Sequence, residues 1–193
     1  SAGTSAKSTV IESSLFQGNT ATSQGTVGLF SNGSLTDVIF KNNKVTDATA
    51  DGAGALFLGS ESQSVLTGNS FVGNASAANG GAIATRVAQN EDGSKNRNDG
   101  MLDIIDSTFV KNTAATDGGA IYNDGRISNI ASNFANNYIE SIGEWAYVSG
   151  GAIYNSGTIG DITGDFIGNY ASSSSSSSYG GAIYNDGTIT SIT

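Results

Sequence analysis

Small and apolar residues recur along the chain in a fixed order, within units typical of short strands joined by turns. The clearest unit, at 118–137, reads GGAIYNDGRISNIASNFANN, and 150–169 repeats it as GGAIYNSGTIGDITGDFIGN. A third copy begins at 180–193. The copies are rich in isoleucine, with phenylalanine near the end of the two complete ones, and glycine and asparagine bound the segments, which is the pattern of β-strands and tight turns.

Phenylalanine closes each unit inside an FxxN tetrapeptide, and earlier copies keep this tail even where their GGAI head is degenerate. These residues are Phe16, Phe40, Phe71, Phe109, Phe134 and Phe166. Successive spacings are 24, 31, 38, 25 and 32 residues. A basic unit of about 24 residues is too short for two packed helices, which need roughly 40. It fits three short strands, so each unit is predicted to be one coil of a parallel β-helix, with longer units carrying loop insertions.

Equivalent residues of stacked coils should form columns spaced by about 4.8 Å. The phenylalanines are predicted to be one interior column, and a second interior column is aliphatic: Leu29, Leu56, Ile83, Ile121, Ile153 and Ile183. By alternation, an outward column follows it: Phe30, Phe57, Ala84, Tyr122, Tyr154 and Tyr184. We expect the glycines of the following turns to need positive φ. They are Gly33, Gly125, Gly157 and Gly187.

Asparagine forms a column of its own, because one asparagine ends every FxxN. The column is Asn19, Asn43, Asn74, Asn112, Asn137 and Asn169. Asparagine tolerates turn geometry, and its amide can bond the backbone or the amide one coil away. These residues are therefore predicted to be structural ladders at the corners of the coils rather than ligand contacts.

Three insertions interrupt the repeat, at 86–100, 138–149 and 170–179. The first carries six charged residues and is predicted to be a solvated loop. The other two leave the same corner of neighbouring coils, so they should lie side by side. They bring together five aromatic residues: Tyr138, Trp145, Tyr147, Tyr170 and Tyr179. This cluster is either a lid, with Trp145 folded onto its own coil, or a contact surface for a glycan or protein. The Tyr122, Tyr154 and Tyr184 column is either a stabilising stack or a second docking strip.

Composition and charge narrow the functional classes. The net charge is −9 and no cluster of lysine or arginine exists, so nucleic acid is not an expected partner. No apolar stretch approaches the roughly 20 residues that cross a bilayer, so direct membrane insertion is not expected. The chain has no histidine and no cysteine, which argues against a zinc site and against Cys/His nucleophiles. We expect no cofactor.

Carboxylates are the remaining candidates for chemistry. Asp103 with Asp106, and Asp161 with Asp165, are the pairs that a glycoside hydrolase would need at a defined separation. Asp37, Asp103 and Asp161 are predicted to share one column, with Asp103 and Asp161 two coils apart, and these two are weak calcium candidates. No lysine or arginine falls in that column. No catalytic residue is therefore assigned, and a polysaccharide lyase or hydrolase stays an alternative.

The four GGAI and six FxxN motifs make this chain similar to the polymorphic membrane proteins of chlamydiae and to related autotransporter passengers, over nearly its full length. That resemblance implies a right-handed β-helix, secreted through an outer-membrane barrel and displayed on the bacterial cell surface or released. It also implies adhesion to a host-cell protein or glycan. We predict an all-β, right-handed, three-sided parallel β-helix of about six coils, forming one domain over residues 1–193, as a fragment of a longer passenger.

The expected function is a non-catalytic adhesin or interaction scaffold. A further alternative is a structural spacer or self-assembling surface fibre. The chain stops after the aliphatic position of Ile189 and before another phenylalanine, so the last coil would expose Ile183, Ile189 and Ile192. End-to-end stacking of such coils would make the chain its own partner.

Overall fold

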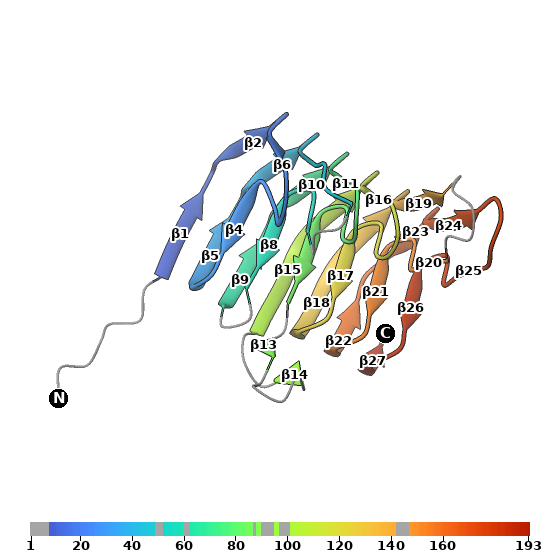
Figure 1. Cartoon of the computed structure of the whole chain (residues 1–193). Coiled ribbons are helices and arrows are strands. Elements are labelled where there is room, and N and C mark those ends of the chain that lie inside the picture. The colour runs from blue at the N-terminus through green and yellow to red at the C-terminus, as the bar shows by residue number, and fades with distance from the viewer. Residues whose placement is uncertain are drawn as a thin grey trace.

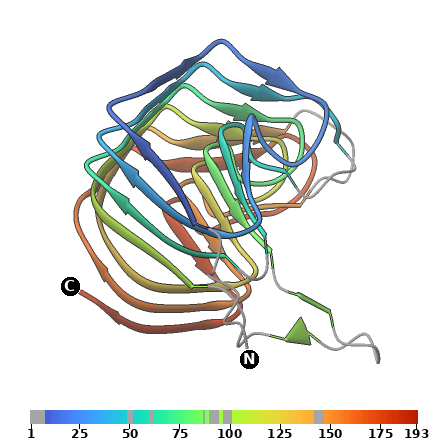
Figure 2. The same cartoon turned by 90° about the vertical axis from the view of Figure 1, so that its left-hand side faces the viewer.

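The chain winds into a parallel β-helix, in which short strands stack coil upon coil along one axis (Figure 1). The computed structural model describes residues 8–48, 52–59, 62–86, 88–89, 95–96, 101–141 and 147–193. The path runs clockwise as it recedes from the N-terminal end, so the coils are right-handed (Figure 2). The first and the last described coils lie at opposite ends of the stack (Figure 1).

Three main sheets form the sides of the helix. Sheet A has eleven strands: β1 (Ser8–Glu12), β5 (Asn32–Thr36), β9 (Gln63–Thr67), β15 (Met101–Val110), β18 (Arg126–Ala135), β22 (Thr158–Thr163) and β27 (Thr188–Ile192), with β2 (Leu15–Gln17), β6 (Ile39–Lys41), β10 (Ser70–Val72) and β23 (Phe166–Ile167). Sheet A is bent, because most coils cross it as two strands, whereas β15 and β18 cross it as one.

Sheets B and C complete the coil and have six strands each, in keeping with the predicted six coils. Sheet B contains β3 (Thr20–Ala21), β7 (Lys44–Val45), β11 (Ala75–Ser76), β16 (Thr113–Ala114), β19 (Tyr138–Ser141) and β24 (Tyr170–Ser173). Sheet C contains β4 (Val27–Leu29), β8 (Leu56–Leu58), β12 (Ile83–Thr85), β17 (Ile121–Asn123), β21 (Ile153–Asn155) and β26 (Ile183–Asn185). All pairings within these three sheets are parallel.

Two small pairs of strands lie in the insertions. β20 (Val148–Ser149) pairs in parallel with β25 (Ser178–Tyr179). In the 86–100 insertion, β13 (Ala88–Gln89) pairs antiparallel with β14 (Lys95–Asn96), which shows hairpin pairing inside the segment predicted to be a loop. Within the described part of the chain, no helix is long and apolar enough to span a membrane.

The phenylalanine column is confirmed as the centre of the core. Successive rings stack with centroids 4.7–5.1 Å apart and planes within 10° of parallel. The four inner rings, those of Phe40, Phe71, Phe109 and Phe134, are fully buried. Isoleucines and leucines from sheets A and C pack around them in one continuous cluster. No coil could bury these side chains alone, so the stack itself creates the apolar interior.

The prediction that Leu29 is the first member of the aliphatic column is wrong. Val27 pairs with Leu56 and Leu29 pairs with Leu58, so Val27 is the member of the column. The residue opposite Phe57 is consequently Gly28 rather than Phe30. The Phe30 ring nevertheless lies against Gly28 and packs 5.8 Å from the Phe57 ring, because the glycine leaves that space open.

The asparagine ladder is present at the corner between sheets A and B. The Oδ1 atom of each asparagine accepts hydrogen bonds from the backbone N–H and the side-chain amide of the asparagine one coil earlier, at 2.9–3.0 Å. Its Nδ2 atom donates to the phenylalanine carbonyl of that earlier coil, at 2.8–3.0 Å. Buried amides are costly unless bonded, and this geometry satisfies them in every coil.

Positive φ occurs at other glycines than those predicted. At Gly33, Gly125, Gly157 and Gly187, φ lies outside the left-handed region. Glycine is needed in the latter two turns for a different reason, since a Cβ on Gly157 would lie 2.1 Å from the Gly125 carbonyl oxygen and one on Gly187 equally close to that of Gly157. Positive φ occurs instead at the first glycine of each GGAI, for example 67° at Gly118.

Candidate contact surface

The two C-terminal insertions lie side by side, as the shared corner predicted. β19 and β24 pair over four residues, whereas the preceding strands of sheet B are two residues long. The strands at the ends of the two insertions, β20 and β25, also pair with each other. The strand pairing brings Tyr138 opposite Tyr170, and their rings stack with centroids 5.2 Å apart.

Three tyrosines of this cluster are exposed. The exposed fraction is 64% for Tyr147, 47% for Tyr179 and 43% for Tyr170. The Tyr179 ring also lies 6.1 Å from the Tyr184 ring at an angle of 47°, which joins the insertions to the tyrosine column of sheet C. Trp145 lies outside the described residues, so its predicted role as lid or contact is not settled. The exposed aromatic area of the cluster therefore includes Tyr170 and Tyr179, which lie on strands and whose rings each contact another tyrosine ring, and Tyr147, which directly precedes β20.

The sheet C column is less exposed than the alternation predicted. Tyr122, Tyr154 and Tyr184 are half-buried, and their rings stack at 5.2 and 5.4 Å. Phe57 and Ala84, predicted to face solvent, are each only 1% exposed. They form a small second cluster with Ala53, since the corner segment before β8 folds over the outer side of sheet C.

Carboxylates surround the middle tyrosine of this column. Burial, together with the charges of Asp117, Asp186 and Asp124, raises the pKa of Tyr154 to about 12. Asp117 lies at the corner before β17, where it forms a bridge with Ser149. Burial raises the pKa of Asp117 to about 6, against the lowering effect of hydrogen bonds from Ser149. The outer side of sheet C is thus an aromatic and acidic surface.

The carboxylate column on sheet A is only partly as predicted. Asp103 and Asp161 do share a column with Asn129 between them. Its earlier members are Val65 and Ser34, so Asp37 does not belong to it. Asp37 lies instead at the bend of sheet A with a φ of 53°.

The two calcium candidates bond to hydroxyl groups. Ser128 donates to Asp103, and Ser191 donates to Asp161 at 2.7 Å. Among the residues that the structure describes, no three Asp, Glu, His or Cys side chains gather in a way that could hold a metal ion. Within the described ranges, Asp103 and Asp161 therefore belong to no group of three acidic side chains.

A change of register opens a polar hollow in sheet A. β18 carries an extra residue, Ser128, near its start, whereas β15 carries an extra residue, Asp106, near its middle. Both strands keep seven residues from the aliphatic to the phenylalanine position, so the core register is preserved. The hollow has a volume of about 360 Å³. Its polar lining includes Asp106, Ser107, Thr108, Ser132, Asn133 and Thr163.

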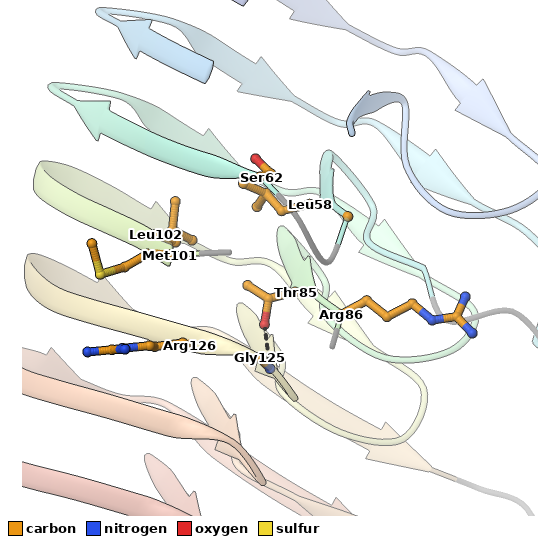
Figure 3. A pocket seen from close by; sticks show the side chains of 9 residues that line it. Leu58, Ser62, Thr85, Arg86, Met101, Leu102, Gly125 and Arg126 are labelled. Atoms are coloured by element: carbon orange, nitrogen blue, oxygen red, sulfur yellow. Dashed lines mark hydrogen bonds between the residues drawn. The ribbon is translucent and has the colours of Figure 1, made fainter. Parts of the chain in front are cut away.

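A smaller pocket lies where the 86–100 insertion leaves the stack (Figure 3). Thr85 Oγ1 accepts a hydrogen bond from Gly125 N–H at 3.2 Å and donates to Asn123 at 2.6 Å, which continues the second amide ladder of Asn123, Asn155 and Asn185. The side chains of Arg86 and Arg126 extend in different directions (Figure 3). The cavity volume is about 10 Å³, room for about one water molecule, so this pocket is not a ligand site.

Sequence reasoning missed two features of these surfaces. One is a third polar ladder at the bend of sheet A, where Asn69 N–H donates to Ser107 and Ser107 N–H donates to Ser132, at 3.2 and 3.1 Å. The other is Asp117. Asp117 directly precedes Gly118 and Gly119, which form the corner that leads into the strand of Tyr122. Its place in the sequence could therefore have predicted a carboxylate near the tyrosine column.

Comparison with known proteins supports the resemblance. Residues 106–124 match the family model of the Chlamydia polymorphic membrane protein repeat. This segment holds one FxxN and one GGAI, from Asp106 in β15 to Asp124 after β17. In it the chain is similar to the polymorphic membrane proteins. Comparisons with curated proteins and with solved structures found no match.

Proposed function

We propose that this chain, which carries the polymorphic membrane protein repeat at residues 106–124, is part of a surface-displayed autotransporter passenger that binds a host-cell protein. The β-helix supplies a rigid stack, and the paired insertions carry the contact surface. The observation that supports this most directly is the exposure of Tyr170 and Tyr179 on strands that pair with the neighbouring insertion, together with that of Tyr147, which directly precedes β20. Rigid aromatic side chains contribute large contact area at low entropic cost, which is why they are enriched at binding hot spots.

The alternative of an inert spacer predicts no such surface. A spacer needs the interior columns and a polar exterior, and it gains nothing from exposed tyrosines at one corner. The sequence alternative of a glycan-active enzyme requires a carboxylate pair that acts on substrate. Its candidates Asp103 and Asp161 lie on sheet A, on a different sheet from the insertions, so the two hypotheses predict loss of function from different substitutions.

The test is binding of the purified protein to cultured epithelial cells, measured by flow cytometry. Replacing Tyr147 and Tyr170 with serine should weaken binding about tenfold or more if they are hot spots. The matched control replaces the exposed Val10 and Val65 of sheet A with serine and should leave binding unchanged. Circular dichroism should show the same β content in all variants. Absence of binding by the wild-type protein, or equal loss in both double variants, would refute the proposal.

A further inference from the structure

The outer side of sheet C repeats a pair of outward residues in each C-terminal coil. In the sequence IYND, or IYNS in the middle coil, isoleucine faces the apolar core and asparagine joins an interior amide ladder, while the tyrosine and the residue two positions later face outward. These later residues are Asp124, Ser156 and Asp186. Ser156 Oγ donates to Asp124 Oδ1 at 2.9 Å, which shows that members of this column face one another across the coils. An acidic column thus follows one side of the tyrosine column.

Asp117 bounds the opposite side of the tyrosine column. It lies at the corner before the GGAI segment and is held by Ser149 of β20. The effect of Asp117, Asp124 and Asp186 on the Tyr154 phenol shows that carboxylates from both corners act on one ring. The surface, defined here as the tyrosine–aspartate face, therefore consists of Tyr122, Tyr154, Tyr184, Asp117, Asp124 and Asp186.

The stacking of the tyrosines determines which groups of this face a binding partner can contact. The Tyr122 and Tyr154 planes are within 4° of parallel, and those of Tyr154 and Tyr184 within 18°. The faces of the middle ring are consequently covered by its neighbours, and Tyr179 lies against Tyr184 at the end of the column. A partner cannot stack a planar group or a sugar ring on a covered face. It meets ring edges, phenol oxygens and carboxylates, which together form a surface rich in hydrogen-bond acceptors.

We infer that the tyrosine–aspartate face binds a cationic segment of the partner protein, rich in lysine or arginine. Ammonium and guanidinium groups carry only donors, and charge-assisted hydrogen bonds to carboxylates are the strong ones. The net charge of −9 adds long-range attraction for such a segment. This inference rests on the proposed function, because the cationic segment would belong to the same partner protein that the paired insertions contact.

The test uses a fluorescein-labelled deca-lysine peptide as probe and a deca-glutamate peptide as negative control, followed by fluorescence anisotropy. Asp124→Asn with Asp186→Asn should weaken deca-lysine binding about fivefold or more and flatten its dependence on salt. The matched control is Asp103→Asn with Asp161→Asn on sheet A. Both double variants remove two negative charges and change the net charge from −9 to −7, so they differ only in place.

Three outcomes of the anisotropy measurement would overturn the inference. The first is an equal loss of deca-lysine binding in both double variants, which would indicate long-range charge alone. The others are no binding of deca-lysine by the wild-type protein, and binding that Asp124→Asn with Asp186→Asn leaves unchanged. Cell binding separates this failure from that of the proposed function. If the Tyr147 and Tyr170 double variant loses cell binding while the Asp124 and Asp186 variant keeps it, the adhesive role stands and the cationic partner is wrong. If glycosidase treatment of the cells abolishes binding of the wild-type protein, and the Asp124 and Asp186 variant binds untreated cells as the wild type does, the partner is a glycan instead.

Discussion

The phenylalanine column and the tyrosine column are both stacks of near-parallel rings with one ring per coil, yet they follow different rules. The inner column is unbroken from Phe16 to Phe166, with centroid distances of 4.7–5.1 Å. The outer column contains Gly28, Phe57 and Ala84 before its three tyrosines, which stack at 5.2 and 5.4 Å. Both columns sit on parallel strands, so strand spacing cannot explain the difference.

The difference lies in what covers each column. Inside the coil, each of the four inner phenylalanines lies between two other phenylalanine rings and packs among buried isoleucines and leucines, so successive coils offer similar apolar surroundings. Outside sheet C, the covering changes from coil to coil, from Ala53 over Phe57 and Ala84 to the insertion strands near Tyr184. Because the interior surroundings are similar in successive coils, phenylalanine fits in each of them. Because the segments that cover the outside of sheet C differ between coils, different residues fit there.

The strongest test of this comparison is truncation of a middle ring of the inner column. Phe134→Ala should lower the free energy of unfolding by roughly 3–5 kcal/mol, because the ring is fully buried between Phe109 and Phe166 and leaves a cavity. Urea unfolding followed by circular dichroism measures it. A loss below about 1 kcal/mol would mean that neighbouring rings close the gap and that the column is not the core.

The corresponding truncation of the outer column should cost less. Tyr154→Ala also removes a ring stacked on both sides, but that ring is half-buried, so we expect a loss of roughly 1–2 kcal/mol. The same urea titration compares it with Phe134→Ala. Equal losses for the two variants would show that stacking, rather than burial, determines the contribution of a ring in this fold.

The smallest expected effect concerns only the Tyr154 hydroxyl. Its pKa is about 12 against an ordinary value of 10.0, so between these values the folded chain keeps a proton that the unfolded chain releases. Folding stability should therefore fall as pH rises from about 10 to 12. Tyr154→Phe keeps the ring stack and should abolish this part of the pH dependence, while changing stability at pH 7 by less than about 0.5 kcal/mol. Absorbance at 295 nm should lose the step near pH 12 in this variant. A retained step would assign it to another tyrosine.

The features that depend on the repeat alone could be predicted from the sequence. The β-helix, the phenylalanine column and the asparagine ladder follow from spacing, because identical residues at identical places in successive coils must meet. The side-by-side placement of the insertions follows for the same reason, since both begin directly after an FxxN asparagine.

The errors arose where one coil differs from the next. Phe30 was predicted to share a column with Phe57 because both are aromatic. The strand register instead pairs Gly28 with Phe57, and the Phe30 ring lies against Gly28. The role of Gly157 depends on how closely two turns approach, which no single copy of the repeat reveals. The half-burial of the tyrosine column depends on the covering segments, whose path is irregular. Asp117 was overlooked because its neighbours come from other coils.

The asparagine ladder gives the stack a direction. The backbone N–H of each ladder asparagine from Asn43 to Asn137 donates to the Oδ1 atom of the asparagine in the coil after it, and none of these bonds runs the other way. Each inner coil therefore presents the same hydrogen-bond donors to the coil after it and the same Oδ1 acceptor to the coil before it. A coil could be duplicated or deleted as a whole without leaving an unmatched amide at the new junction, whereas the loss of a single asparagine would interrupt the ladder. In such a chain, length changes by modules, and the loops between the modules are free to diverge.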